Sequence, residues 1–238
     1  MKAVILAAGK GVRMLPLTED KPKVLIEISG KPFLWYVLEN LRKAGVTELG
    51  IVVNHKKEKM EEFLEKYAIP ATVIQQLEPR GTGDALKHAK AFCGKEQFLV
   101  VSGDNLYSVE DLNLVQRPDD FCYIVGKEVQ DWQRYGVLVT ERDKETERDT
   151  LVRIVEKPKE FVGNLINTGL YKCTAAIWPA LDKMGLSPRG EYELTEAISI
   201  LAQEGKVNVL KSRGYWLDLG SKGDIPKIES FLKQENRR

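Results

Sequence analysis

The sequence is poor in cysteine and histidine. Cys93, Cys122 and Cys173 are odd in number and far apart, with no CxxC pair and no nearby histidine. This pattern argues against a disulfide framework and against a zinc site. We expect all three thiols to be buried as small hydrophobic side chains. His55 and His88, the two histidines, lie in charged, helix-like stretches, and we expect both at the surface.

The sequence also lacks a charge imbalance and any long apolar run. Its 36 lysines and arginines are balanced by 35 aspartates and glutamates, for a net charge of +1, so no overall field attracts nucleic acid or an anionic membrane. Any anion site must be local. Apolar runs such as QFLVVSG are too short to cross a bilayer, and the first residues have neither the length nor the flanks of a signal peptide. We therefore expect a cytoplasmic protein.

What the sequence does contain is an alternation of strand-like and helix-like segments, over a length of 238 residues that suits one domain. β-branched runs at 2–8, 48–54, 71–76 and 97–104 predict buried strands, and segments of helical period at 32–45, 57–67 and 83–92 lie between them. This order predicts parallel strands joined by helical crossovers.

From residue 121 onward the predicted strands follow one another closely. They cover 121–126, 135–140, 150–158 and 167–173, with the polar stretch 141–149 as an exposed hairpin tip. The last part alternates again, with helices at 192–205 and 224–234 and strands at 206–212 and 215–221. We predict an α/β fold: a Rossmann-like, mixed, mostly parallel sheet flanked by helices, with antiparallel additions in the second half.

The stretch LAAGKGVRMLPLTEDKPK, residues 6–23, follows the first predicted strand, where ligands bind in α/β sheets. Gly9 and Gly11 let the backbone approach phosphate oxygens, and Arg13 and Lys23 supply positive charge. A dinucleotide fingerprint requires a third glycine at position 14, which is Met14, and the GK pair lacks the Ser or Thr of a Walker A loop. The stretch alone predicts a phosphate-binding loop, with an ordinary tight turn as the alternative.

Two aspartates stand at the ends of predicted strands. Asp104 follows a strand expected near the centre of the sheet, and Asp218 ends another strand far along the chain. Mg²⁺ usually takes one or two protein carboxylates together with water and substrate phosphates, although a single Asp before Asn or Gly is more often a turn former. Glu156 and Lys157 are adjacent, just before Pro158, so both side chains can face one ligand only where the backbone turns. The alternative is that both are ordinary charged residues at the surface.

Eight motifs in this order, LAAGKGVRMLPLTEDKPKVL, PRGTGDAL, VSGDN, RYGVL, VEKP, NTGLY, GEYELTEAI and WLDLGS, resemble the sugar-1-phosphate nucleotidylyltransferases. The resemblance runs from residue 1 to about 220 and is strongest to glucose-1-phosphate uridylyl- and thymidylyltransferases and to the uridylyltransferase half of N-acetylglucosamine-1-phosphate enzymes. It implies the nucleotide-diphospho-sugar transferase fold as a single catalytic domain, residues 1–238. Within it, 1–120 is mainly the nucleotide-binding half, 121–220 mainly the sugar-phosphate-binding half, and 221–238 a C-terminal helix.

The resemblance also implies the reaction, in which a sugar 1-phosphate oxygen attacks the α-phosphorus of a Mg²⁺-bound nucleoside triphosphate and pyrophosphate leaves. It implies catalytic roles for Arg13, Lys23 and Lys157, Mg²⁺ ligation by Asp104 and Asp218, and nucleotide contacts from Leu6, Ala8, Gly9, Gly11, Gln76, Gly81 and Thr82. It assigns the sugar to Gly136, Glu156 and Asn167, with Tyr135 and Tyr171 lining it. We expect the amide of Gln76 to offer both a donor and an acceptor to a pyrimidine.

The sequence departs from the family pattern at Val12, where Thr or Ser is usual, so we expect one hydroxyl contact to the phosphates to be missing. No hexapeptide repeats follow in the printed sequence, so we expect no left-handed β-helix acetyltransferase domain and no trimer imposed by one. A homo-oligomer remains compatible with the sequence.

Two other classes of protein remain as alternatives. A non-catalytic, nucleotide-sugar-binding regulatory relative is expected to lack a metal carboxylate or the loop arginine, and this chain has both. A glycosyltransferase also uses aspartates on an α/β sheet, but its usual DxD spacing is absent, because Asn105 and Leu106 follow Asp104. The sequence does not separate UTP from dTTP, since uracil and thymine differ by one methyl group, nor glucose from N-acetylglucosamine.

Overall fold

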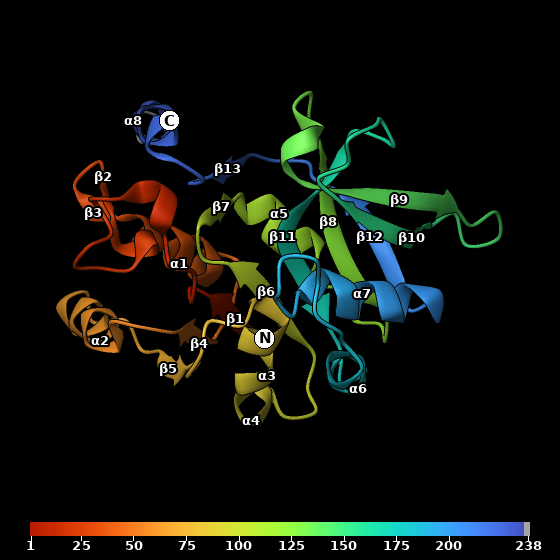
Figure 1. The fold of residues 1–238 in the computed structure, drawn as a ribbon, viewed down its shortest axis with the longest axis horizontal. Coiled ribbons are helices and arrows are strands. Elements are labelled where there is room, and N and C mark those ends of the chain that lie inside the picture. Colours follow the sequence, from red (N-terminus) through yellow and green to blue (C-terminus); the bar gives the residue numbers. More distant parts are fainter. Residues whose placement is uncertain (236–238) are drawn as a thin grey trace.

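The computed structural model describes residues 1–235 and is built on a nine-stranded sheet (Figure 1). From edge to edge its strands are β5 (Thr72–Gln75), β4 (Glu48–Val53), β1 (Lys2–Leu6), β6 (Phe98–Ser102), β11 (Leu165–Cys173), β8 (Cys122–Glu128), β12 (Val207–Lys211), β10 (Asp149–Glu156) and β9 (Gly136–Arg142). Only β10 and β11 run against the other seven strands. The prediction of a mostly parallel sheet with antiparallel additions is confirmed.

Helices cover both faces of this sheet. Because side chains alternate along a strand, Ala3 and Ile5 of β1 face one core and Val4 faces the other. The first core is closed by α1 (Phe33–Lys43), α2 (Lys57–Lys66), α5 (Val109–Leu114) and α8 (Ile225–Glu235). The second is closed by α3 (Thr82–His88), α4 (Lys90–Cys93), α6 (Ile177–Asp182) and α7 (Leu194–Gln203). Burial on both sides explains why the strands read as continuous apolar runs.

Several elements differ from the prediction. The expected helix 83–92 is interrupted at Ala89, which separates α3 from α4. The short helices α5 and α6 and the ribbon of β2 (Glu27–Ile28) and β3 (Lys31–Pro32) were not predicted. The segment that carries Asp218, β13 (Trp216–Asp218), does not join the large sheet but pairs with β7 (Asn105–Tyr107). The expected C-terminal helix is α8, and residues 236–238 lie outside the described part of the chain.

The expectations for cysteine and histidine have different outcomes. All three cysteines are free and buried, as predicted. His55 lies between β4 and α2 and not on a helix, and it is partly buried, which together with Lys56 and Lys10 lowers its pKa. His88 ends α3 and is exposed, so the surface expectation is confirmed for His88 and not for His55. Among the described residues, no helix is long and apolar enough to span a membrane.

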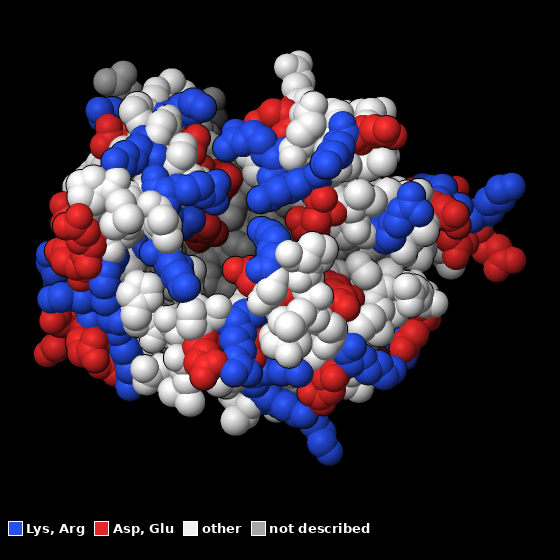
Figure 2. Space-filling model, viewed as in Figure 1, with Lys and Arg blue, Asp and Glu red and all other residues white. Residues whose placement is uncertain are grey.

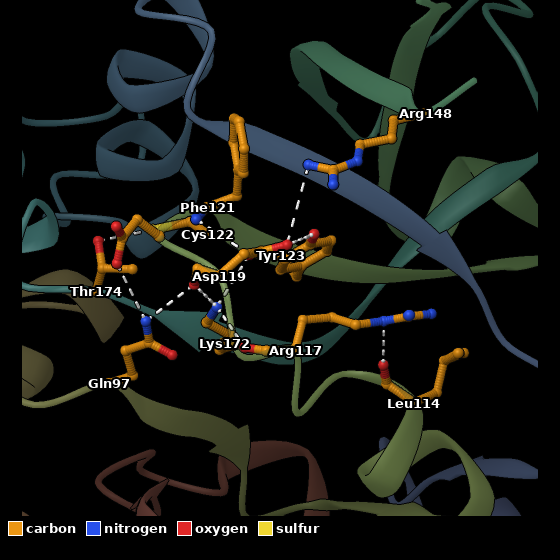
Figure 3. Close-up of polar contacts among 11 residues, drawn as sticks. Gln97, Leu114, Arg117, Asp119, Phe121, Cys122, Tyr123, Arg148, Lys172 and Thr174 are labelled. Atoms are coloured by element: carbon orange, nitrogen blue, oxygen red, sulfur yellow. Dashed lines mark hydrogen bonds and ion pairs between the residues drawn. The ribbon is translucent and has the colours of Figure 1, made fainter. Parts of the chain in front are cut away.

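A fully buried lysine fastens β11 to the loop that precedes β8 (Figure 3). The ammonium of Lys172 donates to the carbonyl oxygen of Arg117 at 2.7 Å, to the carbonyl of Asp119, and to the Asp119 carboxylate at 3.3 Å. The hydroxyl of Tyr123 donates to the same carboxylate at 2.6 Å. A buried charge is tolerated only with such partners, so this cluster fixes the centre of the sheet where its two halves meet.

Candidate functional site

A cleft of about 460 Å³ opens at the carboxyl ends of β1 and β6. Figure 2 shows it as a hollow with lysine and arginine side chains gathered around it, although the protein as a whole is nearly neutral. Ten of the predicted site residues line it: Leu6, Ala8, Gly9, Gly11, Arg13, Lys23, Gln76, Gly81, Thr82 and Asp104. Asp218, Gly136, Glu156, Lys157 and Asn167 do not line this cleft. Lys10, Arg13 and Lys23 supply local positive charge to this cleft, and the carboxylates of Asp104 and Glu191 also line it.

The glycine loop leaves the cleft open at one position and makes a tight turn at another. Gly11 has φ of 65°, and a Cβ there would lie 3.0 Å from the methyl group of Thr18, so this position requires glycine. A Cβ on Gly9 would meet nothing within 4 Å, so folding does not require glycine there. The empty space beside Gly9 suits a ligand that approaches the backbone. Arg13 is exposed and forms no ion pair with any described residue.

The two aspartates lie beside each other although 114 positions separate them in the sequence. Asp218 stands opposite Asn105 in the β13–β7 ribbon, and the Leu219 N–H donates to the carbonyl of Asp104 at 2.9 Å. Burial, and next the charge of Asp104, raise the pKa of Asp218 to about 6. Lys23 pairs with the Asp104 carboxylate, whose other oxygen accepts from the Asn105 amide at 3.0 Å.

This pair of carboxylates fits a divalent cation. Asp218 has no hydrogen-bond donor among the described residues, and burial and Asp104 raise its pKa more than the charges of Lys23 and Arg134 lower it. Beside it, Asn105 Oδ1 is buried without a hydrogen-bond partner. No group of three or more His, Cys, Asp or Glu in residues 1–235 forms a metal cage. Mg²⁺ does not need one, because substrate phosphates and water complete its shell.

The amide of Gln76 lies at the other end of the cleft, in a fixed orientation. Its backbone extends β5, with the N–H donating to Val53 at 2.7 Å and the carbonyl accepting from Asn54 at 2.8 Å. Its side-chain Nε2 donates to the carbonyl of Gly81 at 3.2 Å and to the carboxylate of Asp84 at 2.7 Å. Both amide hydrogens are engaged within the protein, so the expected donor to a base is not available and only Oε1 remains.

The loop with Gly81 and Thr82 is joined to the segment that precedes α7. Gly81 has φ of 109°, and a Cβ there would lie 2.5 Å from the carbonyl oxygen of Tyr192. That same oxygen accepts from the N–H of Gly83 at 2.8 Å, and the Thr82 hydroxyl accepts from the N–H of Leu194 at 3.0 Å. The loop therefore has its shape from a segment about 110 residues further along the chain.

Glu156 and Lys157 adopt the backbone turn that the sequence required for a shared ligand. Lys157 has φ of 43°, in the left-handed region that non-glycine residues rarely occupy, and its N–H donates to Tyr135 at 3.0 Å. Burial, and next the charge of Glu193, raise the pKa of Glu156, while Lys157 opposes this shift. Gly136 is the strand partner of Glu156, and a Cβ on it would lie 3.0 Å from Glu156 Oε1.

Asn167 and the two tyrosines complete this second group. The Asn167 amide donates to the Tyr171 hydroxyl at 2.6 Å and accepts from the Gly169 N–H at 2.8 Å, where β11 bulges away from β8. Burial raises the pKa of Tyr171. Burial, and next the charge of Asp218, raise the pKa of Tyr135 to about 12. The rings of Tyr135 and Trp216 pack with centroids 5.5 Å apart, so Tyr135 lies beside β13, the strand that carries Asp218.

Sequence reasoning missed Asp84 and Glu193 as individual residues. Glu193 is buried, binds Arg189 through two hydrogen bonds of 3.0 and 2.7 Å, and affects the pKa of Glu156. Both stand inside quoted motifs, PRGTGDAL and GEYELTEAI, which were used only as whole patterns. In both motifs the carboxylate stands between residues without charge, and this isolated charge was the sequence signal that could have identified it.

Comparisons with known proteins cover nearly the whole chain. The model of a family described as Nucleotidyl transferase matches residues 2–235. UTP–glucose-1-phosphate uridylyltransferase AglF of Haloferax volcanii is 38% identical over 245 residues, which cover 99% of this chain and 98% of that protein. A bifunctional sugar-1-phosphate nucleotidylyltransferase/acetyltransferase of Sulfurisphaera tokodaii is 38% identical over 234 residues, or 97% of this chain and 55% of that protein.

The chain thus spans about half the length of the bifunctional relatives it matches. A solved structure of UDP-glucose pyrophosphorylase complexed with UDP-glucose has a TM-score of 0.88 to this chain at 23% identity and covers 98% of both chains. At that identity the likeness shows the fold, and it confirms the predicted architecture.

Proposed function

Because the chain belongs to the nucleotidyl transferase family, we propose that it transfers a nucleotidyl group from a nucleoside triphosphate to a hexose 1-phosphate and releases pyrophosphate. The observation that carries this proposal is that Asp218 lies beside Asp104, which lines a cleft together with Lys10, Arg13 and Lys23. Two anionic substrates must meet there, so charge neutralisation and positioning are the main tasks of the site.

In this reaction an oxygen of the sugar 1-phosphate forms a bond to the α-phosphorus while the bond from that phosphorus to the pyrophosphate oxygen breaks. The attacking oxygen is already ionised, so no side chain is required as a base. Asp104 and Asp218 would hold Mg²⁺, which, when bound, neutralises the triphosphate and polarises the α-phosphate.

The cations of the chain have distinct parts in this scheme. Arg13 is free to bind the leaving phosphates, with the open backbone at Gly9 beside it. Lys23 is held at the aspartate pair by Asp104, so its charge is already positioned before a nucleotide binds. Lys157 would hold the sugar phosphate, and the carboxylate of Glu156 together with Asn167 and Gly136 would bind sugar hydroxyls. Leu6, Ala8, Gln76, Gly81 and Thr82 would enclose the base.

We propose UTP or dTTP as the nucleotide and glucose 1-phosphate or N-acetylglucosamine 1-phosphate as the acceptor. The 38% identity to AglF over the full length of both chains supports the uridylyl group and glucose 1-phosphate. A non-catalytic, nucleotide-sugar-binding protein is the second candidate, favoured only by the ion pair that occupies Asp104. The three free thiols fit the reducing cytoplasm that we propose as its location.

Pyrophosphate release is the direct test. UTP, dTTP, CTP, GTP and ATP are each combined with glucose, N-acetylglucosamine, galactose and mannose 1-phosphates in the presence of Mg²⁺. The proposal predicts release that requires both substrates and that disappears with EDTA. Asp104→Ala and Asp218→Ala should abolish it, whereas Asp143→Ala, in the exposed turn between β9 and β10, is the matched control and should not. Nucleotide binding without release in any combination would support the non-catalytic alternative.

A further inference from the structure

We propose that Asp84 determines the nucleobase specificity of the cleft by fixing the amide of Gln76 so that only its carbonyl oxygen faces the ligand. A cleft that presents only this acceptor selects uracil or thymine, whose N3 carries a hydrogen, and rejects cytosine, whose N3 carries a lone pair. The inference rests on the proposed function, because it concerns the nucleotide that the same site binds. Asp84 acts through Gln76 and is therefore a positioning residue.

The orientation of the Gln76 amide follows from its two partners. A carboxylate oxygen and a backbone carbonyl oxygen can only accept hydrogen bonds, so the nitrogen end of the amide must point to Asp84 at 2.7 Å and to Gly81 at 3.2 Å. A flipped amide would place its oxygen against two other oxygens. The bond to the carboxylate is the shorter of the two, and bonds to charged acceptors are about twice as strong as neutral ones.

The other end of the amide is open toward the cleft. Gln76 is 1% exposed overall and lines the cleft, and no described residue donates to its Oε1. The buried side-chain atoms without partners in residues 1–235 are Asn105 Oδ1 and Asn208 Nδ2, and Gln76 Oε1 is not among them. The little exposure that Gln76 has is thus consistent with an acceptor that looks into the cleft.

An acceptor that cannot rotate discriminates among pyrimidines. It pairs with the N3–H of uracil or thymine, whereas cytosine would bring the N3 lone pair against Oε1. A freely rotating glutamine would turn its NH₂ group toward cytosine and bind both bases. Discrimination between the bases therefore depends on how firmly the amide is held. The hydrogen bonds of the Gln76 backbone and the bond to the Gly81 carbonyl involve main-chain atoms, so a side-chain substitution does not remove them. The carboxylate of Asp84 is the anchor that a mutation can remove.

The environment of Asp84 allows it to be changed without loss of packing. It lies in the first turn of α3, its side chain is 20% exposed, and its other neighbour is His88 Nε2 at 3.6 Å. Asp84→Leu removes the acceptor and is larger than aspartate, whereas Asp84→Asn keeps the shape and one oxygen that can accept from Gln76. His88→Ala is the matched control, because it removes the second neighbour of Asp84 and leaves the Asp84–Gln76 bond intact.

The test measures kcat/KM with UTP and with CTP at saturating sugar 1-phosphate, and binding of both nucleotides by calorimetry. The wild-type protein should prefer UTP by roughly 100-fold or more, and should bind N3-methyl-UTP, which has no N3–H, about as poorly as CTP. Asp84→Leu should reduce the UTP/CTP ratio by about tenfold, Asp84→Asn by less, and His88→Ala not at all. In a Gln76→Ala background, Asp84→Leu should leave the ratio unchanged.

Several results would overturn the inference. If Asp84→Leu weakens UTP and CTP equally, the residue only supports the fold. Equal binding of UTP and N3-methyl-UTP by the wild-type protein would show that Oε1 does not read the base, and this result requires no variant to fold. Failure of the proposed function is distinct, because it removes pyrophosphate release for every nucleotide, while the binding ratios still report on Asp84.

Discussion

Replacing Asp218 with asparagine is expected to stabilise the metal-free protein while it abolishes catalysis. Burial and the neighbouring charge of Asp104 raise the pKa of Asp218 from 3.8 to about 6. Each pKa unit corresponds to about 1.4 kcal/mol, so the ionised side chain weakens the fold by at most roughly 3 kcal/mol at pH 8. Because Asp218 is partly exposed, solvent screening reduces the expected gain of Asp218→Asn to about 1–2 kcal/mol.

The gain depends on pH with a definite sign. A carboxyl group whose folded-state pKa is raised favours the folded state while it is protonated, so its contribution is fully present below pH 4 and is lost as the pH rises through 6. The asparagine variant does not titrate. Its advantage over the wild-type protein should therefore be largest above pH 6, shrink as the pH falls, and vanish near pH 4.

Urea unfolding in EDTA at pH 8 and at pH 4.5 measures this difference. Asp104→Asn is the comparison, because it also removes one of the two neighbouring charges but loses the ion pair with Lys23, so it should give no gain. Both variants should lose Mg²⁺-dependent pyrophosphate release. A lower stability of Asp218→Asn at pH 8, or the same gain at both pH values, would refute the account of the aspartate pair.

Three further changes test other parts of the structure. Lys157→Ala should raise KM for the sugar 1-phosphate about tenfold or more and leave nucleotide binding within about twofold, which steady-state kinetics and calorimetry separate; unchanged KM and kcat would remove its assigned role. Lys172→Ala should lower the free energy of unfolding by about 3–5 kcal/mol and Lys172→Met by about 2–3, because methionine fills the space but leaves the Arg117 and Asp119 carbonyls unpaired; urea titration showing the larger loss for methionine would contradict this. Gly81→Ala should cost about 1–3 kcal/mol of stability and weaken nucleotide binding, since its Cβ would lie 2.5 Å from the carbonyl oxygen of Tyr192. A UTP affinity equal to that of the wild-type protein in calorimetry would show that the loop tolerates the added Cβ.

The family and the first half of the fold could be predicted because their signals are local. Strands such as β1 and β4 are buried on both faces and therefore read as apolar runs, and the helices between them keep a 3.6-residue period. The resemblance to the sugar-1-phosphate nucleotidylyltransferases is confirmed by the family match and by the full-length relative. The hairpin of β9 and β10 was equally visible, because its polar tip separates two β-branched runs.

The remaining features depend on contacts between distant segments. Nothing near Trp216 shows that β13 leaves the large sheet to pair with β7. The six residues of α5 are too few for a periodic pattern, although the Ser108 cap, which accepts from the Asp111 N–H at 3.1 Å, was a readable signal. The direction of the Gln76 amide depends on Asp84 and Gly81, and amide direction leaves no trace in a sequence.

The segment before α7 has a consequence for how the two substrates influence each other. Tyr192 holds the loop of Gly81 through its carbonyl, and the next residue, Glu193, acts on the carboxylate of Glu156. Two adjacent residues, Tyr192 and Glu193, thus act on both proposed subsites. In the proposed function, a change in the rigidity of this backbone on nucleotide binding would alter the affinity for the sugar phosphate, and linkage makes the effect on affinity equal in both directions.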